Sequence, residues 1–242
     1  MYDFELVKPT TVEDAVAALA GDEAQPLGGG QTLIPTMKQR LAMPGTLVST
    51  LGIESMKGVS AEGGVLTVGG ATTHGTVAAE AASSYPGLAA LAGGIGDPAV
   101  RNRGTIGGSL ANNDPAACYP AGLLGSGGTV VTNTREIDAD DFFQGMFTTA
   151  LEEGELITAV KFNIPEKAAY AKFAQPASRF PLTAAFVAKT SDGVRVAITG
   201  ASEEGVFRWT EAEEALSSNF SADAVDGLSV DADGMIGDIH GT

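Results

Sequence analysis

The sequence predicts an α+β fold, and three observations lead to this class. Segments that alternate apolar and polar residues, as strands do, are interspersed with segments that carry an apolar stripe at helical spacing. The turns between them are of several kinds, so strand and helix do not alternate regularly as in a βαβ protein. The chain has 242 residues, of which 44% are hydrophobic, which is enough for one large domain or two smaller ones with a proper core.

The first elements follow from local patterns. Residues 3–8 alternate and predict a strand. Thr11 is the expected N-cap of a helix over 12–20, with Asp14 three positions on as its partner in a capping box. Up to residue 95, the same reasoning predicts strands at 24–27, 46–50 and 64–70, and helices at 32–41, 72–82 and 87–95.

The middle of the chain, residues 100–124, predicts a strand, a glycine turn, a loop and a helix in that order. Asp114 followed by Pro115 is typical of a helix start. On a strand, Arg101 and Arg103 would point to the same face, where they would fix the next loop or pair with acidic residues of a neighbouring subunit. A hairpin is expected at 128–138, a short helix at 140–147 and a strand at 155–164.

The residue pattern changes over 165–179, and this stretch is the candidate domain boundary. Beyond it, residues 181–202 predict two antiparallel strands around a Ser-Asp-Gly turn. A helix over 210–218 follows.

Charge and composition exclude several classes of function. The net charge is −16, with 14 Lys and Arg against 30 Asp and Glu, so nucleic acid and an anionic membrane surface would both be repelled. The ten acidic residues from Glu203 to the end, against the single basic Arg208, indicate a solvated face or, less simply, a docking patch. We expect no transmembrane segment, because no apolar run approaches the required ~20 residues. We also expect no secretory signal, because the N-terminus "MYDFELVKPT" lacks a basic segment followed by an apolar one. Cys118 is the only cysteine, which excludes an internal disulfide or iron–sulfur cluster and favours the cytoplasm.

Two glycine clusters, at 28–33 and 104–114, carry the functional hypothesis. Neither fits a dinucleotide-binding Rossmann motif or a P-loop. Each follows an expected strand and precedes an expected helix, so bare backbone N–H groups would form a nest for phosphate oxygens. Two such nests could share one pyrophosphate; the alternative is that both clusters are merely tight turns. Polar side chains accompany each cluster: Gln31 and Thr32 in the first, and Ser109, Asn112 and Asn113 in the second.

These two segments, "PLGGGQTLIPTMKQRL" and "IGDPAVRNRGTIGGSLANNDPAA", closely resemble the signatures of the FAD-binding medium subunit of molybdenum hydroxylases, a family that includes carbon monoxide dehydrogenase medium chains and the flavin domain of xanthine dehydrogenase. The resemblance extends over the whole chain, including "KFAQPASRF" and the terminal "DIHGT". It implies a two-lobed FAD-binding domain of the vanillyl-alcohol oxidase and p-cresol methylhydroxylase type over residues 1–166, with lobes at roughly 1–55 and 56–166. A small α+β C-terminal domain over 167–242, like that of carbon monoxide dehydrogenase flavoproteins, would follow.

The resemblance also implies which residues hold FAD between the lobes. The first loop would wrap the pyrophosphate and ribityl region, and the second would oppose it. Asp114 would contact ribityl or ribose hydroxyls, cap a helix, or do both. Ile106 and Leu156 would border the flavin rings, and Phe180 would stack near the isoalloxazine. The implied residues are Gly28, Gly29, Gly30, Gln31, Thr32, Leu33, Thr105, Ile106, Gly107, Gly108, Ser109, Asp114, Leu156 and Phe180.

The sequence departs from the family at two places. Cys118 stands where relatives commonly carry an acidic residue, and we interpret it as a buried small hydrophobe rather than a flavin-linking thiol. Relatives continue beyond "DIHGT" with a basic, apolar helix, so we expect either that the sequence is truncated after Thr242 or that the C-terminal domain lacks its last helix. His74 is expected to cap or pack a helix rather than catalyse, and no partner is apparent for His240. Lys38 and Arg40 would serve docking or form a plain exposed helix face.

The resemblance implies an oxidoreductase component that passes electrons. Electrons from a large molybdopterin subunit would reach FAD through two [2Fe–2S] clusters of a small subunit, and would then leave for NAD, a quinone or oxygen. A heterotrimer, or a dimer of heterotrimers, is therefore expected. No residue of this chain is expected to act as a catalytic acid or base, and none to bind metal. Two alternatives remain: a self-contained flavin oxidase or dehydrogenase of the same fold, and an assembly scaffold that has lost FAD.

Overall fold

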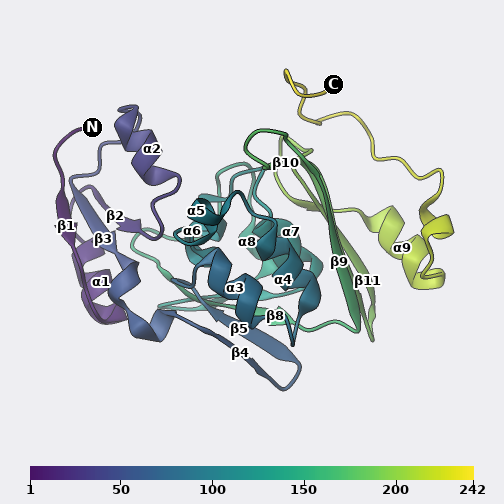
Figure 1. The fold of residues 1–242 in the computed structure, drawn as a ribbon, viewed down its shortest axis with the longest axis horizontal. Coiled ribbons are helices and arrows are strands. Elements are labelled where there is room, and N and C mark those ends of the chain that lie inside the picture. The colour runs from purple at the N-terminus through teal and green to yellow at the C-terminus, as the bar shows by residue number, and fades with distance from the viewer.

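The computed structural model describes residues 1–242 and contains three β-sheets with helices between and around them (Figure 1). The first sheet is small and parallel, in the order β1 (Glu5–Val7), β3 (Thr46–Ser49), β2 (Ala24–Leu27). Helix α1 (Val12–Leu19) crosses between its strands, and its buried Ala15 and Leu19 join a small core. Thr11 caps α1 as predicted, because its Oγ1 accepts from Asp14 N at 3.1 Å.

The second sheet is antiparallel, and its central strand comes from far along the chain. Its order is β4 (Val59–Glu62), β5 (Val65–Gly69), β8 (Ile157–Asn163), β6 (Thr129–Thr132), β7 (Glu136–Asp138). The predicted hairpin over 128–138 is confirmed by the β6–β7 pairing. Because β8 lies between β5 and β6, it brings the residues just before it back to the first sheet.

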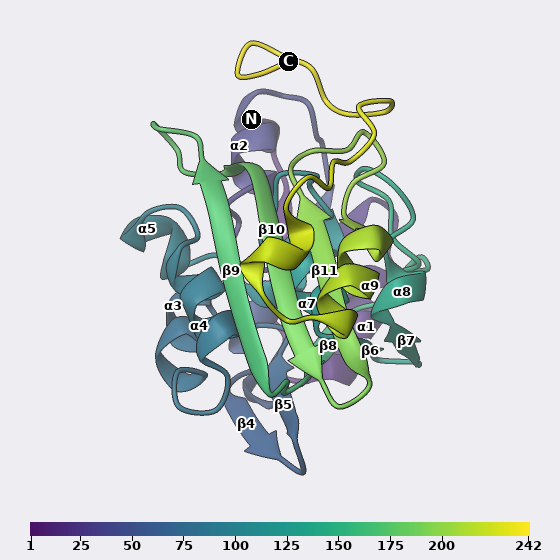
Figure 2. The same cartoon turned by 90° about the vertical axis from the view of Figure 1, so that its right-hand side faces the viewer.

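The third sheet is antiparallel in the order β12 (Phe207–Arg208), β11 (Gly193–Thr199), β10 (Pro181–Thr190), β9 (Lys167–Ala174). Strands β10 and β11 pair around the predicted turn, from Thr190 opposite Gly193. Helix α9 (Thr210–Ser218) covers the outer face of this sheet (Figure 2) through Ala212 and Leu216, which pack on Val194, Val196 and Ile198.

A helical layer fills the space between the second and third sheets (Figure 1). It consists of α3 (His74–Glu80), α4 (Pro86–Gly93), α6 (Ile106–Asn112) and α7 (Tyr119–Gly125). The largest hydrophobic core joins these helices to both sheets, for example through Val160 of β8 and Phe186 of β10. The remaining short elements are α2 (Leu33–Lys38), α5 (Pro98–Arg101), α8 (Ala139–Phe142) and three 3₁₀ turns at Thr50–Gly52, Glu54–Met56 and Ala222–Val225.

The prediction for residues 98–114 was wrong in its element types. The expected strand is the helix α5, whose N-cap Asp97 accepts from Val100 N at 3.0 Å. The second glycine cluster is not a loop before a helix but the first turns of α6 itself, which begins at Ile106 with Thr105 as N-cap. Arg101 therefore does not share a strand face with Arg103.

One further prediction needs correction. Asp114 does not cap a helix: its Oδ1 accepts from Ala116 N at 2.9 Å within a turn, and α7 begins only at Tyr119. Residues 167–174 of the expected boundary stretch form β9, an edge strand paired with β10 along its length. No helix of the protein combines the length and apolar character that crossing a lipid bilayer requires.

Candidate cofactor site

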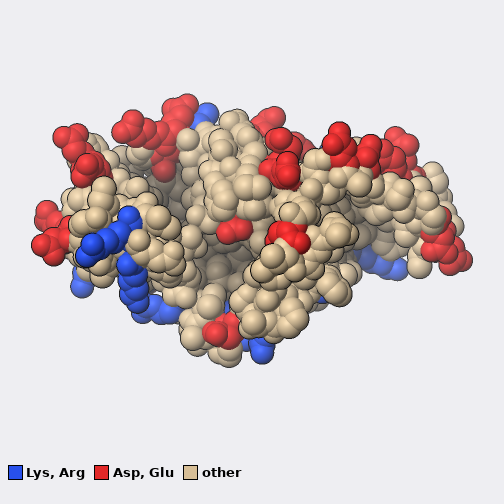
Figure 3. Space-filling view, turned by 90° about the horizontal axis from the view of Figure 1, so that it is seen from above, with Lys and Arg blue, Asp and Glu red and all other residues tan.

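A cavity of about 890 Å³ lies where the first sheet, the helical layer and the β9–β10 turn meet. Its lining comes from 25–36, 104–118, 151–157 and 178–181, with further residues from α3 and the 95–100 segment. The surface is hollowed in the middle of the face shown in Figure 3, and mostly uncharged atoms border this hollow. The volume lies within the range of small-molecule and cofactor sites.

The cavity gathers the predicted site residues, with one exception. Ile106 does not line it: its side chain is fully buried in the large core, because it points from the first turn of α6 toward the second sheet. The other predicted residues all line the cavity: Gly28, Gly29, Gly30, Gln31, Thr32, Leu33, Thr105, Gly107, Gly108, Ser109, Asp114, Leu156 and Phe180.

The two glycine clusters touch each other. A Cβ on Gly29 would stand 1.9 Å from the carbonyl oxygen of Arg103, and one on Gly28 would stand 2.6 Å from Thr105 Oγ1. Both distances are far below van der Waals contact, so no side chain fits at either position. These two glycines are therefore required by the contact between the loops, before any ligand is considered.

The first cluster offers free backbone donors. None of the N–H groups from Gly28 to Leu33 donates a hydrogen bond within the protein. Gly30 has φ +70°, a left-handed conformation that turns the chain between β2 and α2. A run of unpaired amides at the rim of a cavity is a nest for an anionic group.

The second cluster offers far fewer such donors, which corrects the prediction of two matching nests: from Gly104 to Ser109, only the N–H of Thr105 donates no hydrogen bond within the protein. Ile106 N donates to Thr72 O at 3.1 Å, and Gly107 N donates to Gly70 O at 2.9 Å. Gly108 N is taken by the cap oxygen of Thr105 at 3.2 Å. These bonds hold the start of α6 against residues 70–72, which follow β5, so the amides of its first turn that would otherwise form an anion site are already used.

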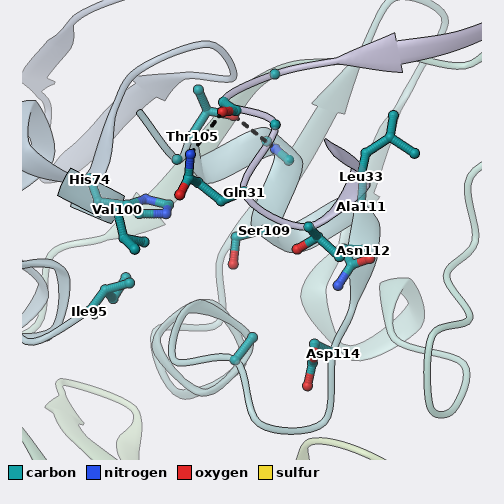
Figure 4. A pocket seen from close by; sticks show the side chains of 18 of the residues that line it. Gln31, Leu33, His74, Ile95, Val100, Thr105, Ser109, Ala111, Asn112 and Asp114 are labelled. Atoms are coloured by element: carbon teal, nitrogen blue, oxygen red, sulfur yellow. Dashed lines mark hydrogen bonds between the residues drawn. The ribbon is translucent and has the colours of Figure 1, made fainter. Parts of the chain in front are cut away.

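What α6 contributes to the cavity is space and polar side chains. A Cβ on Gly108 would contact only Thr105 Oγ1, at 3.0 Å, and would otherwise point into open volume. Ser109 and Asn112 both line the cavity from α6 (Figure 4). The arrangement is thus asymmetric, with backbone donors on one wall and side chains on the other.

His74 also lines the cavity, and sequence reasoning assigned it no part there. It is the first residue of α3, where Thr73 is the N-cap, and only 5% of its surface is exposed. Burial, with a smaller contribution from the nearby Arg101 guanidinium, lowers the pKa of His74 to about 4, so its imidazole is neutral at pH 7. Its Nδ1 has no hydrogen-bond partner in the protein.

An ion pair between the buried Glu155 and the partly exposed Arg135 positions the segment that carries Leu156. Glu155 is 2% exposed at its side chain and accepts from Arg135 Nε at 2.9 Å and from Thr132 Oγ1 at 2.7 Å. The hydrogen bond from Arg135 is the main reason that the pKa of Glu155 falls to about 2. Leu156 N in turn donates to Asn133 Oδ1 at 2.7 Å, so this edge of the cavity is fixed by the β6–β7 turn.

Further lining residues lay outside the sequence prediction. Ile95 and Val100 form an apolar wall, and Arg101 holds it by donating to the carbonyl oxygens of Ile95 and Gly96 at 3.1 and 2.9 Å. The segment "IGDPAVRNRG" belongs to the family signature, but the structure has the helix α5 where the sequence predicts a strand, and this helical turn places these side chains.

Cys118 is buried in the cavity wall, and burial raises the pKa of its thiol, which therefore stays protonated. Phe180, opposite, packs edge-on against His240 of the terminal segment with ring centroids 5.8 Å apart. Arg179 is the only Lys or Arg among the lining residues. A bound anion would therefore depend on backbone donors more than on cations. No group of His, Cys, Asp or Glu side chains is arranged to hold a metal ion.

The fold and this cavity define a nucleotide-cofactor-binding protein of mixed α and β structure, and comparison with known proteins identifies its family. The family model described as the FAD binding domain in molybdopterin dehydrogenase matches residues 2–166. The carbon monoxide dehydrogenase medium chain of Afipia carboxidovorans is 36% identical over 201 residues, covering 78% of this chain and 70% of that protein. The nicotine 6-hydroxylase medium subunit of Paenarthrobacter nicotinovorans is 34% identical, covering 97% of this chain and 88% of that protein.

Solved structures agree with this assignment. Carbon monoxide dehydrogenase from Hydrogenophaga pseudoflava superposes with a TM-score of 0.85 at 32% identity, covering 93% of this chain and 84% of the other. Quinoline 2-oxidoreductase from Pseudomonas putida 86 gives a TM-score of 0.89 at 27% identity, covering 100% and 90%. The chain belongs to the FAD-binding family of molybdenum hydroxylases, and it is an oxidoreductase component whose cofactor is FAD.

Proposed function

We propose that this chain is the electron-transfer subunit of a molybdenum hydroxylase, in which FAD occupies the described cavity and passes electrons from the [2Fe–2S] clusters of a partner subunit to an external acceptor. FAD supplies the redox chemistry when bound, and the protein supplies binding and orientation. The observation that carries the proposal is the run of unpaired amides from Gly28 to Leu33 on the wall of a cavity of cofactor size.

The residues present fit a flavin nucleotide. The unpaired amides would donate to the diphosphate, which suits a lining that holds Arg179 as its only Lys or Arg. Ser109 and Asn112 would donate to or accept from the polar linker of the cofactor from the opposite wall, and the open side of Gly108 leaves room for it. Ile95, Leu156 and Phe180 would border the rings.

The domain organisation of the chain is part of the same proposal. Residues 1–166 would form the FAD-binding domain, with the first sheet in one lobe and the second sheet in the other. Residues 167–242 would form a C-terminal domain whose β9–β10 turn supplies Arg179 and Phe180 to the cavity. The cytoplasmic location of the protein stays a prediction.

Partner subunits follow from what the chain lacks and from how its relatives are named. With Cys118 as its one cysteine, it has no ligands for a cluster of its own. The relatives carry the names medium chain, medium subunit and subunit alpha of a complex. We infer a large molybdopterin subunit and a small [2Fe–2S] subunit as partners, in a heterotrimer or a dimer of heterotrimers.

The test combines reconstitution with a reduction assay. The purified chain should bind FAD and show visible flavin absorbance, and its flavin should be reduced by substrate only when the molybdenum and iron–sulfur subunits are added. Reduction of the isolated flavoprotein by a small organic substrate would instead favour a self-contained oxidase. Failure of the folded chain to retain any FAD would favour an assembly scaffold.

A further inference from the structure

The polar side chain of His74 occupies a buried position where an apolar side chain would cost less free energy. Only 5% of it is exposed, and its ring packs against that of Tyr119 with centroids 5.3 Å apart. Its Nδ1 is buried without a partner. An unsatisfied buried polar atom costs free energy, so a leucine would serve the core better if packing were the only role.

The other ring nitrogen is directed toward the cavity. Nε2 lies against Gly104, where an added Cβ would come within 2.5 Å of it, and Gly104 in turn lies next to the cap residue Thr105. In Figure 4 the imidazole projects from α3 toward the space between Gln31 and Ser109, that is, between the two walls of the cavity. The backbone of His74 is held at the same place, since His74 N donates to Gly104 O at 3.0 Å.

The chemistry of a neutral imidazole limits the hydrogen bonds that His74 can form with a ligand in the cavity. Such a ring carries one N–H donor and one lone pair, on different nitrogens. With Nδ1 enclosed in the core, Nε2 is the atom that can reach a ligand, and a proton on Nε2 makes it a donor. The flavin nucleotide presents acceptors of the matching kind, namely its phosphate, ribityl and ring carbonyl oxygens.

We infer that His74 is a binding residue for the cofactor, whose Nε2–H donates a hydrogen bond to an oxygen acceptor of FAD. This inference rests on the proposed function, because it takes the cavity to be the FAD site. His74 would position the cofactor from the floor of the cavity, while the amides from Gly28 to Leu33 act at its rim.

Three variants of the full chain test this role: His74→Leu, which removes the donor; His74→Gln, whose amide nitrogen reaches about as far as Nε2; and Tyr119→Phe as the matched control. The hydroxyl of Tyr119 is likewise buried without a partner, beside His74, but Tyr119 does not line the cavity. The two readouts are the Kd for FAD, from quenching of flavin fluorescence, and the thermal midpoint of the FAD-free protein.

We expect His74→Leu to weaken FAD binding about tenfold, the value of one hydrogen bond of ~1.4 kcal/mol, without lowering the midpoint of the FAD-free protein. His74→Gln should stay within about threefold of the wild-type Kd, and Tyr119→Phe should leave the Kd unchanged. Wild-type affinity in His74→Leu would overturn the inference. Equal weakening in the Leu and Gln variants, or a lowered midpoint that accompanies the loss of affinity, would also overturn it, because packing would then explain the effect. Absence of FAD binding by the wild-type chain would instead refute the proposed function.

Discussion

At the scale of single residues, the glycines of the two clusters fall into two groups. Gly29 faces the backbone of Arg103 and Gly104, whereas Gly108 faces the cavity. The sequence pattern predicts the same task for both clusters, the binding of one pyrophosphate. The structure separates the requirement of folding from the requirement of binding, and the two substitutions therefore have different expected outcomes.

Gly108→Val should fold normally but bind FAD much more weakly. Its Cβ contacts only the Thr105 side chain, and α6 tolerates a valine better than a glycine in its first turns. The branched side chain would enter the space proposed for FAD, so we expect the affinity to fall by about 100-fold, or about 2.7 kcal/mol, with the unfolding midpoint of the FAD-free protein unchanged. Fluorescence titration and thermal unfolding check the two parts. Unaltered affinity would place the cofactor elsewhere.

Gly29→Val should instead damage the fold. A Cβ at 1.9 Å from a carbonyl oxygen forces the two loops apart, and we expect a loss of about 3 kcal/mol or more in the free energy of unfolding, as for strong overpacking. Denaturant unfolding of the FAD-free protein measures it. A variant as stable as the wild type would contradict the direct contact between the clusters.

Glu155 makes stability depend on pH in the acid range. Its pKa is about 2 in the folded protein, below the value of 4.5 for a free side chain, so the unfolded state binds more protons between these two values. Stability from this group is fully present above about pH 4.5 and is lost as the pH falls toward 2. Glu155→Gln should remove this part of the acid dependence and cost about 2 kcal/mol at pH 7, since Arg135 loses its charged acceptor. Parallel acid unfolding curves for the two proteins would contradict this account.

At the scale of elements, α6 is held at its N-terminus by Thr105, which also contacts the first glycine loop. Its Oγ1 accepts from Gly108 N and lies where a side chain on Gly28 would be. Thr105→Ala should cost about 1 kcal/mol, the usual value of a helix cap, whereas Thr105→Ser should retain most of it. Thermal unfolding of the pair separates the hydroxyl from the methyl group, and equal loss in both variants would show that the cap is not the stabilising feature.

Elements with a strong local signal were predictable from the sequence. Thr11 and the apolar stripe after it predicted α1, the Ser-Asp-Gly turn predicted the β10–β11 hairpin, and residues 210–218 form α9 as expected. In each case the turn or cap residue and the periodicity of the segment agree with the tertiary structure.

The segment around the second cluster was not predictable in the same way. Residues 104–108 include three glycines, which are poor helix formers. Yet α6 forms, because Gly107 must approach the backbone of Gly70 and its amide must reach Gly70 O. That contact is with the residue that follows β5, far earlier in the chain, so no local sequence pattern predicts it. The placement of His74 and Ile95 on the cavity depends on the same long-range packing.

At the scale of the whole molecule, the site exists because distant segments converge. The loop after β2, the start of α6, the segment before β8 and the β9–β10 turn meet at one cavity. Motif resemblance predicted which residues gather there, with the exception of Ile106. It did not predict which of them provide donors, because that depends on hydrogen bonds made elsewhere in the fold.

The assembly prediction also belongs to this scale. Mixed with the small [2Fe–2S] subunit of its own complex, the chain should elute from size exclusion as a larger species. With a net charge of −16, it should show an association that varies with salt, since exposed charges are screened over about 8 Å at physiological ionic strength. Separate elution of the two proteins at every salt concentration would argue against a subunit role.

The central claim is that the unpaired amides from Gly28 to Leu33 bind the diphosphate of FAD, while α6 contributes side chains and space. A crystal structure of the chain with FAD tests it most directly. The account predicts diphosphate oxygens within hydrogen-bonding distance of these amides, with the amides of Ile106 and Gly107 still bonded to Thr72 and Gly70. A diphosphate bound by the start of α6, with the amides of the first loop facing solvent, would contradict it.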